Sequence, residues 1–206
     1  MTPQRLQAAL PKGLMLMGHL VEDGQSLVLL GADAAFWAAL QDAPEFAAPD
    51  PVDLWSLRVV GDLAQALGAE PLFPFGGPPY QPFIRWAFDT GRAWPSPTGM
   101  LVHDLAGLMI SYRGALRFDH DLGWAPDTGA SPCDSCAEKP CITACPVSAL
   151  SGTAPYDVPS CHAFLDTEEG ADCMGRGCKV RRACPISQGF GRSDAQSAHH
   201  MRSFHP

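Results

Sequence analysis

Cysteine is absent from the first 132 residues of this 206-residue chain, although the chain contains eight cysteines. The chain also lacks any run of the roughly 18–20 apolar residues that a membrane-spanning helix needs. Its apolar run at 13–21 is too short for a span and is followed by no small-residue cleavage site. We therefore expect neither a membrane span nor a secretory signal. The expected location is cytoplasmic, because thiols there stay reduced and free to bind metal.

The chain also has fewer basic than acidic residues. The chain has 14 Lys and Arg against 22 Asp and Glu, which gives a formal net charge of −8. Such a surface repels phosphate backbones, so nucleic acid is not an expected partner. An acidic surface instead suits docking to a basic patch on another protein.

Familiar catalytic signatures are missing as well. The chain contains no Ser-His-Asp order, no paired carboxylates and no Walker loop. The sequence therefore identifies no catalytic residue and leaves open whether the protein is an enzyme.

All eight cysteines fall between residues 133 and 184. The first four have the spacing C-x2-C-x4-C-x3-C-P, which matches the bacterial ferredoxin run C-x2-C-x2-C-x3-C-P except for two extra residues after Cys136. In that run the fourth cysteine binds the other cluster of a pair. We predict two [4Fe–4S] clusters. The predicted metal ligands are Cys133, Cys136, Cys141, Cys184, Cys145, Cys161, Cys173 and Cys178.

A short internal repeat favours a pair of clusters. Ala144-Cys-Pro-Val-Ser148 recurs 39 residues later as Ala183-Cys-Pro-Ile-Ser187. The proline fixes φ and has no N–H, so it should turn the chain away after the ligand and begin the next short helix.

Other interpretations of the cysteines stay open. Disulfides need an oxidising compartment, which the missing export signal disfavours. Two four-cysteine zinc sites are the more serious alternative, but zinc sites favour paired C-x2-C knuckles and only Cys133–Cys136 forms one. A single cluster is a further alternative, because the last four cysteines have long spacers.

Turn-forming residues from Asp119 to Pro132 separate the cysteine-rich part from the rest. We predict an N-terminal domain over 1–123 and a small dicluster domain over 124–206. The second lacks long periodic apolar elements, so cysteine ligands should replace part of its hydrophobic core.

The N-terminal part predicts an α+β fold with helices against an antiparallel sheet. Two apolar runs joined by Glu-Asp-Gly-Gln at 22–25 predict a β-hairpin. Asp53 and Gly68 predict the ends of a helix. Its predicted apolar residues are Leu54, Leu57, Val60, Leu63 and Leu67. Further predicted elements are helices over 34–41, 83–91 and 192–204, and strands over 100–102 and 108–118 around a turn at 104–107.

The C-terminal third resembles the two-cluster ferredoxin-like domain of epoxyqueuosine reductases and related corrinoid reductases, including the isolated Cys161 before the last three cysteines. The gaps after Cys136, Cys173 and Cys178 are wider than in that family. Epoxyqueuosine reduction itself does not fit, because an acidic chain without extra basic repeats is a poor tRNA binder.

The N-terminal part is similar to cobalamin-processing proteins that decyanate or dealkylate that cofactor. Asp50-Pro-Val-Asp53 and the stretch from His103 to Gly114 carry this likeness. The resemblance implies a flavin-reductase-like α/β sandwich, shorter here than in the relatives, with cobalamin or flavin bound near His103 and Arg113. From the residues alone, a hydrogen-bonded histidine and a salt-bridged arginine are the ordinary interpretations of these positions.

Spacing and resemblance together assign each cysteine to a cluster. Cys145 lies about one helical turn, some ~5–6 Å, beyond Cys141 and should point away from the loop that wraps the first cluster. The repeat implies the reverse for Cys184, as in two-cluster ferredoxins. A closed site of the first four cysteines is the alternative. We expect Cys133, Cys136, Cys141 and Cys184 to hold one cluster, and Cys145, Cys161, Cys173 and Cys178 the other.

The leading interpretation is an iron–sulfur protein that transfers electrons through two clusters, with a redox protein as its partner. The alternative is a corrinoid- or flavin-dependent reductase in which the clusters serve as internal electron donors.

Overall fold

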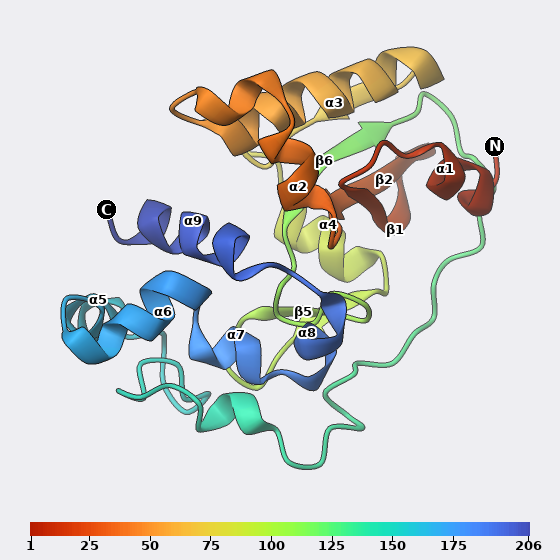
Figure 1. The fold of residues 1–206 in the computed structure, drawn as a ribbon. Helices are drawn as coiled ribbons and strands as arrows, with labels where there is room; N and C mark the ends of the chain where they lie inside the picture. Colours follow the sequence, from red (N-terminus) through yellow and green to blue (C-terminus); the bar gives the residue numbers. More distant parts are fainter. The chain divides into compact units, whose positions relative to one another are not determined.

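A computed structural model describes all 206 residues (Figure 1). The chain divides into two compact units, each built from two stretches of sequence. Residues 1–92 and 111–129 form the first, which we call the N-terminal unit. Residues 93–110 and 130–206 form the second, the cysteine-rich unit.

These units differ from the predicted division into 1–123 and 124–206. Residues 93–110 belong to the cysteine-rich unit, and 124–129 belong to the N-terminal unit. Val102 and Leu108 explain the first difference, because they are buried in one apolar cluster with Val180. The turn-rich segment before the cysteines signals where the chain leaves the N-terminal unit. No comparable sequence signal marks residues 93–110, where the chain first leaves the N-terminal unit.

A four-stranded antiparallel sheet forms the centre of the N-terminal unit. Its order is β1-β2-β6-β3. The strands are β1 (Leu14–Glu22), β2 (Gln25–Ala32), β3 (Glu70–Leu72) and β6 (Tyr112–Arg117). Asp23 and Gly24 join β1 to β2 with φ values of 51° and 77°, as a two-residue turn of type I′ requires. The predicted hairpin is confirmed.

Helices pack against this sheet and supply much of its core. They are α1 (Pro3–Ala9), α2 (Phe36–Gln41), the 3₁₀ turn η1 (Pro44–Ala47), α3 (Pro51–Leu67) and α4 (Phe83–Asp89). In Figure 1, α3 runs alongside β6, and Trp55 and Val60 of α3 share one buried cluster with Leu116 of β6. Gly114 permits this approach, since a Cβ there would lie 2.9 Å from Val60.

The predicted apolar face of α3 is partly wrong. The helix begins at Pro51 rather than at a cap on Asp53, and Leu54 and Leu57 are 40% and 45% exposed. Proline is favoured at the first helical position because its missing N–H is not needed there. The buried face instead contains Val52, Trp55, Ser56, Val59, Val60, Leu63 and Ala64. Gly68 ends the helix in a left-handed conformation, as predicted.

Short elements make up the cysteine-rich unit. They are β4 (Ala93–Pro95), β5 (Leu101–His103), η2 (Pro140–Ile142), α5 (Val158–Leu165), η3 (Glu168–Gly170), α6 (Ala171–Arg176), α7 (Lys179–Ala183), α8 (Pro185–Phe190) and α9 (Asp194–Phe204). The helix predicted for the C-terminal tail is confirmed as α9, which packs against α6.

The strand predicted over 108–118 is shorter than expected and does not pair with β5. The strand β5 pairs with β4, whereas β6 begins only at Tyr112 and pairs with β2 and β3. Backbone bonds between His103 and Gly107 close the intervening turn. The α+β class is nevertheless confirmed, since helices accompany small antiparallel sheets.

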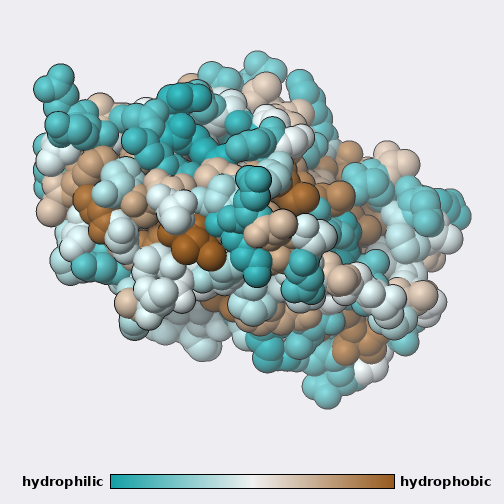
Figure 2. Space-filling model, turned by 90° about the horizontal axis from the view of Figure 1, so that it is seen from below, coloured by the Kyte–Doolittle hydropathy of each residue, from teal (hydrophilic) through white to brown (hydrophobic).

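Hydrophilic side chains cover most of the face in Figure 2, with separate hydrophobic patches between them. No helix has the length and apolar character needed to cross a bilayer.

Candidate metal centre

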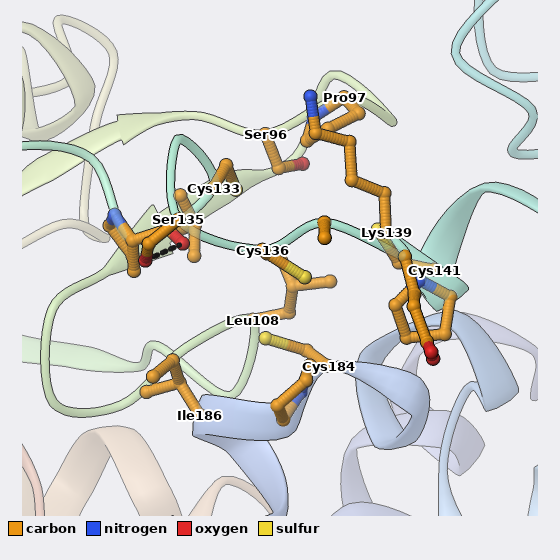
Figure 3. Close-up of a pocket in the computed structure, with 16 residues that line it drawn as sticks. Ser96, Pro97, Leu108, Cys133, Ser135, Cys136, Lys139, Cys141, Cys184 and Ile186 are labelled. Carbon is orange, nitrogen blue, oxygen red and sulfur yellow. Dashed lines mark hydrogen bonds between the residues drawn. The ribbon is translucent and has the colours of Figure 1, made fainter.

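Four cysteines of the cysteine-rich unit line one pocket of about 360 Å³ (Figure 3). In Figure 3 the sulfur atoms of Cys136 and Cys184 point into the same space. Val102, Leu108 and Ile186 supply apolar wall around it. The four cysteines, which we call the first cysteine group, are Cys133, Cys136, Cys141 and Cys184.

Local backbone geometry presents these thiols. Ser131 begins a tight turn: its carbonyl accepts from Asp134 N–H at 3.0 Å and its Oγ from Cys133 N–H at 3.3 Å. Lys139 has φ 43°, a left-handed conformation that reverses the chain before Cys141. Cys184 lies between α7 and α8, where Pro185 begins the next helix as the Ala-Cys-Pro motif predicts.

Gly107 allows the backbone to pack closely against Ser187 and Cys184. Its φ is +56°, and a Cβ there would lie 2.6 Å from Ser187 N and 3.1 Å from Cys184 Sγ. The adjacent Leu108 N–H donates to Ser187 Oγ at 2.8 Å. Only glycine fits this close approach without displacing the chain that carries Cys184.

The remaining four cysteines come from different elements. Cys145 follows η2, Cys161 lies in α5, Cys173 lies in α6, and Cys178 caps the start of α7. We call these four the second cysteine group.

Electrostatic coupling among the thiols follows the same division. Burial raises the pKa of Cys141, and the neighbouring Cys133, Cys184 and Cys136 raise it further. Burial likewise raises the pKa of Cys133, with Cys184 and Cys136 contributing.

The second group shows its own coupling. Burial raises the pKa of Cys161, with Cys145 and Cys173 adding to the shift. Burial also raises the pKa of Cys173, and Cys178 adds to that shift. The structure therefore brings the four cysteines of the first group to one pocket, and the thiols of the second group raise one another's pKa.

Tyr156 was not singled out by the sequence. Burial raises the pKa of its hydroxyl most, followed by its hydrogen bond to Cys161 and by the charges of Cys161, Cys178 and Cys145. A tyrosine five residues before a cysteine follows no recognised spacing, so only the fold reveals this neighbour of the second group.

The type of donor atom and the size of the pocket limit which metal groups the cysteines could hold. All eight cysteines are free thiols, and no three His, Cys, Asp or Glu side chains are placed to hold a metal ion. A single zinc ion needs four thiolates about 2.3 Å from one centre. A four-iron cluster is much larger and keeps its thiolates further apart. The pocket of about 360 Å³ lined by the first cysteine group has room for a group larger than one zinc ion.

His103 lies fully buried in the cysteine-rich unit. Its Nδ1 accepts from the backbone N–H of Leu105 at 3.1 Å, and its own backbone pairs with Gly107. These bonds hold the turn before Leu108, which matches the ordinary interpretation of this histidine.

Arg113 belongs to the other unit, so the two predicted cofactor-binding residues are not in one compact body. Its side chain is 11% exposed, with Nη1 3.8 Å from Asp53 Oδ1 and the guanidinium 5.9 Å from the centre of the Phe36 ring. Burial lowers the pKa of Arg113 to about 10, against the favourable charge of Asp53. Its Nε has no hydrogen-bond partner.

No protein-family model matches this sequence, and neither a curated protein nor a solved structure shows significant similarity to it.

Proposed function

We propose that this protein transfers electrons through two [4Fe–4S] clusters held by its cysteine-rich unit, and that it exchanges those electrons with a redox partner protein. The observation that best supports this proposal is the division of eight free thiols into two groups of four, one of which lines a pocket. Bound clusters would supply one-electron chemistry, with potentials set by charge, hydrogen bonds and solvent exposure.

The crossing of ligands between halves of the motif supports a pair of sites. Cys184 joins the group of Cys133, Cys136 and Cys141, although it is more than 40 residues away in the chain. Cys145 instead contributes to the shifts of the second group. An exchange of fourth ligands, as in two-cluster ferredoxins, would produce this division, so a ferredoxin-like dicluster arrangement is part of the proposal.

The short helix α7 supports electron passage between the sites. Cys178 of the second group caps its start and Cys184 of the first group caps its end. At 1.5 Å rise per residue, the two ligands are about 9 Å apart along the helix. Two clusters at this separation would exchange electrons with each other rather than act as two independent centres.

A paired substitution tests the proposal. Cys145→Ala should remove the cluster of the second group, and Cys184→Ala the cluster of the first. Each variant should lose about half of the iron and sulfide and keep the other cluster's paramagnetic signal. The reduced wild type should also pass electrons to a one-electron acceptor. Loss of the same signal in both variants would contradict the assignment, and a wild type without iron would overturn the function.

A second candidate function is a corrinoid- or flavin-dependent reductase whose N-terminal unit, flavin-reductase-like in fold, holds the cofactor. The observation that favours it is the nearly buried Arg113, whose Nε lacks a hydrogen-bond partner. Titration with cobalamin and with flavin nucleotides should then show saturable binding that Arg113→Met abolishes. No binding of either cofactor at high micromolar concentration would leave the plain electron carrier.

A further inference from the structure

The loop between Cys136 and Cys141 is one place where the cysteine motif departs from the ferredoxin spacing. It contains four residues, Ala137-Glu-Lys-Pro140, where the ferredoxin run has two. All four line the pocket of the first cysteine group, together with its four thiols. The longer loop therefore forms part of the pocket wall, and it brings one basic side chain, that of Lys139, to the thiols.

Lys139 has a backbone conformation that is uncommon for lysine. Its φ of 43° and ψ of 55° are left-handed, a region that glycine and asparagine adopt more readily. Pro140 follows at once and begins the turn η2 that carries Cys141, and the Ile142 N–H donates to the Lys139 carbonyl at 3.0 Å. A glycine would form the same turn without the steric penalty, so the turn alone does not explain a lysine here.

The side chain of Lys139 lies at the pocket and its charge is not neutralised by an acid. In Figure 3 it extends from its loop toward Ser96 and Pro97, which line the same pocket. Lys179, the other lysine of this unit, has its Nζ 3.6 Å from Asp172 Oδ2, whereas Lys139 forms no ion pair. A positive charge without a carboxylate partner therefore stands beside four thiols.

The surroundings favour an anionic group next to this ammonium. Cys141 and Cys184 are buried and most of the pocket wall is apolar, so charges across it are screened less than in water. Burial raises the pKa of Cys133, and the charge of Lys139 opposes that rise. Glu138 also lines the pocket, but it is exposed, so water screens its charge more effectively. Four thiolates around an iron–sulfide core would supply the anion.

We propose that Lys139 is the counter-charge of the first cysteine group and raises the reduction potential of the cluster bound there above its value without this charge. This inference rests on the proposed function. Reduction adds one electron from a one-electron donor and neither forms nor breaks a bond in the protein. It makes the cluster and its thiolates more negative by one charge, and a cation held at the pocket stabilises that state.

The experiment is a potentiometric titration of the anaerobically reconstituted full chain, with dithionite as reductant and paramagnetic resonance as readout. Lys139→Asn removes the charge and suits the left-handed backbone. It should lower the reduction equilibrium constant of the first cluster at least threefold, about 28 mV for a one-electron couple. Cys145→Ala, which removes the second cluster, assigns the signals. Lys12→Gln, an equal loss of charge at an exposed position of the N-terminal unit, should shift neither potential.

Lys139→Arg keeps the charge and decides the matter if Lys139→Asn cannot hold its cluster. The arginine variant should stay within about twofold of the wild-type equilibrium constant. A larger fall in this variant, or a fall of less than about threefold in a fully loaded Lys139→Asn protein, would overturn the inference and leave the clusters in place. Wild-type protein without iron and sulfide would instead be a failure of the proposed function.

Discussion

Leu108 donates its backbone N–H to Ser187 Oγ at 2.8 Å, although the two residues are 79 positions apart. The bond fastens the 93–110 segment to the start of α8, three residues after Cys184. Ser187 is the last residue of the repeated Ala-Cys-Pro motif. Its counterpart Ser148 has φ 54° and follows a proline that starts no helix. The two copies therefore present their cysteines on different backbones.

Gly107→Ala should loosen the first cysteine group. The added Cβ would overlap Ser187 N and crowd Cys184 Sγ, and small-to-large changes of this kind cost about 1–3 kcal/mol. We expect loss of the cluster absorbance in urea to be at least about tenfold faster than in wild type. Gly99→Ala is the matched control, because Gly99 also has positive φ but has open space around it. Equal rates in the two variants would show that the close packing is unimportant.

Removal of iron should unfold the cysteine-rich unit and spare the N-terminal unit. The apolar cluster around the first group includes Cys141 and Cys184 themselves, so apolar side chains alone give a small core. Hydrogen exchange of the apo-protein should accelerate across 93–110 and 131–192, while β1 and β2 keep their protection. Unchanged protection over 131–192 in the apo-protein would refute metal-dependent folding.

Acid should destabilise the N-terminal unit through His19. Burial lowers the pKa of this histidine below 6.5, against the charges of Asp121 and Asp127, and its Nε2 lies 3.1 Å from Ser26 Oγ. The fold therefore favours the neutral ring. This contribution to stability is fully present above pH 6.5 and is lost as the pH falls from there through the lowered folded pKa. Opening free energies of β2 amides, measured by hydrogen exchange, should fall from pH 7.5 to 5.5. His19→Gln should flatten that dependence, and an equally steep profile in the variant would exclude His19 as its cause.

Arg113→Met should cost little stability. Burial of the guanidinium costs desolvation free energy, which only the ion pair with Asp53 at 3.8 Å offsets. The side chain of Asp53 is itself 45% exposed. Methionine fills similar space without a charge, and such replacements are often neutral or stabilising. We expect the free energy of unfolding of the N-terminal unit to change by less than about 1 kcal/mol. A loss of 3 kcal/mol or more, as reported for broken buried pairs, would make Arg113 a structural residue and weaken the case for a cofactor there.

Some elements are predictable because their signals are local. Asp23-Gly24 specifies the hairpin turn, and Gly68 ends α3, each through a positive φ that few residues adopt. The start of α3 was missed because Pro51 and Asp53 are both reasonable first-turn residues. Spacing and resemblance together also predicted that Cys184 lies with Cys133, Cys136 and Cys141, and these four residues line one pocket.

Long-range packing explains the rest. Nothing local marks 93–110 as part of the cysteine-rich unit, because its assignment depends on Val102 and Leu108 meeting residues far along the chain.

Metal analysis of protein purified without oxygen tests the central claim most directly. Iron, acid-labile sulfide and zinc should be measured per chain, together with an absorbance spectrum. Two [4Fe–4S] clusters predict about eight iron and about eight sulfide per chain, with a broad band near ~400 nm that dithionite bleaches. A colourless protein that contains zinc and no iron would contradict the account.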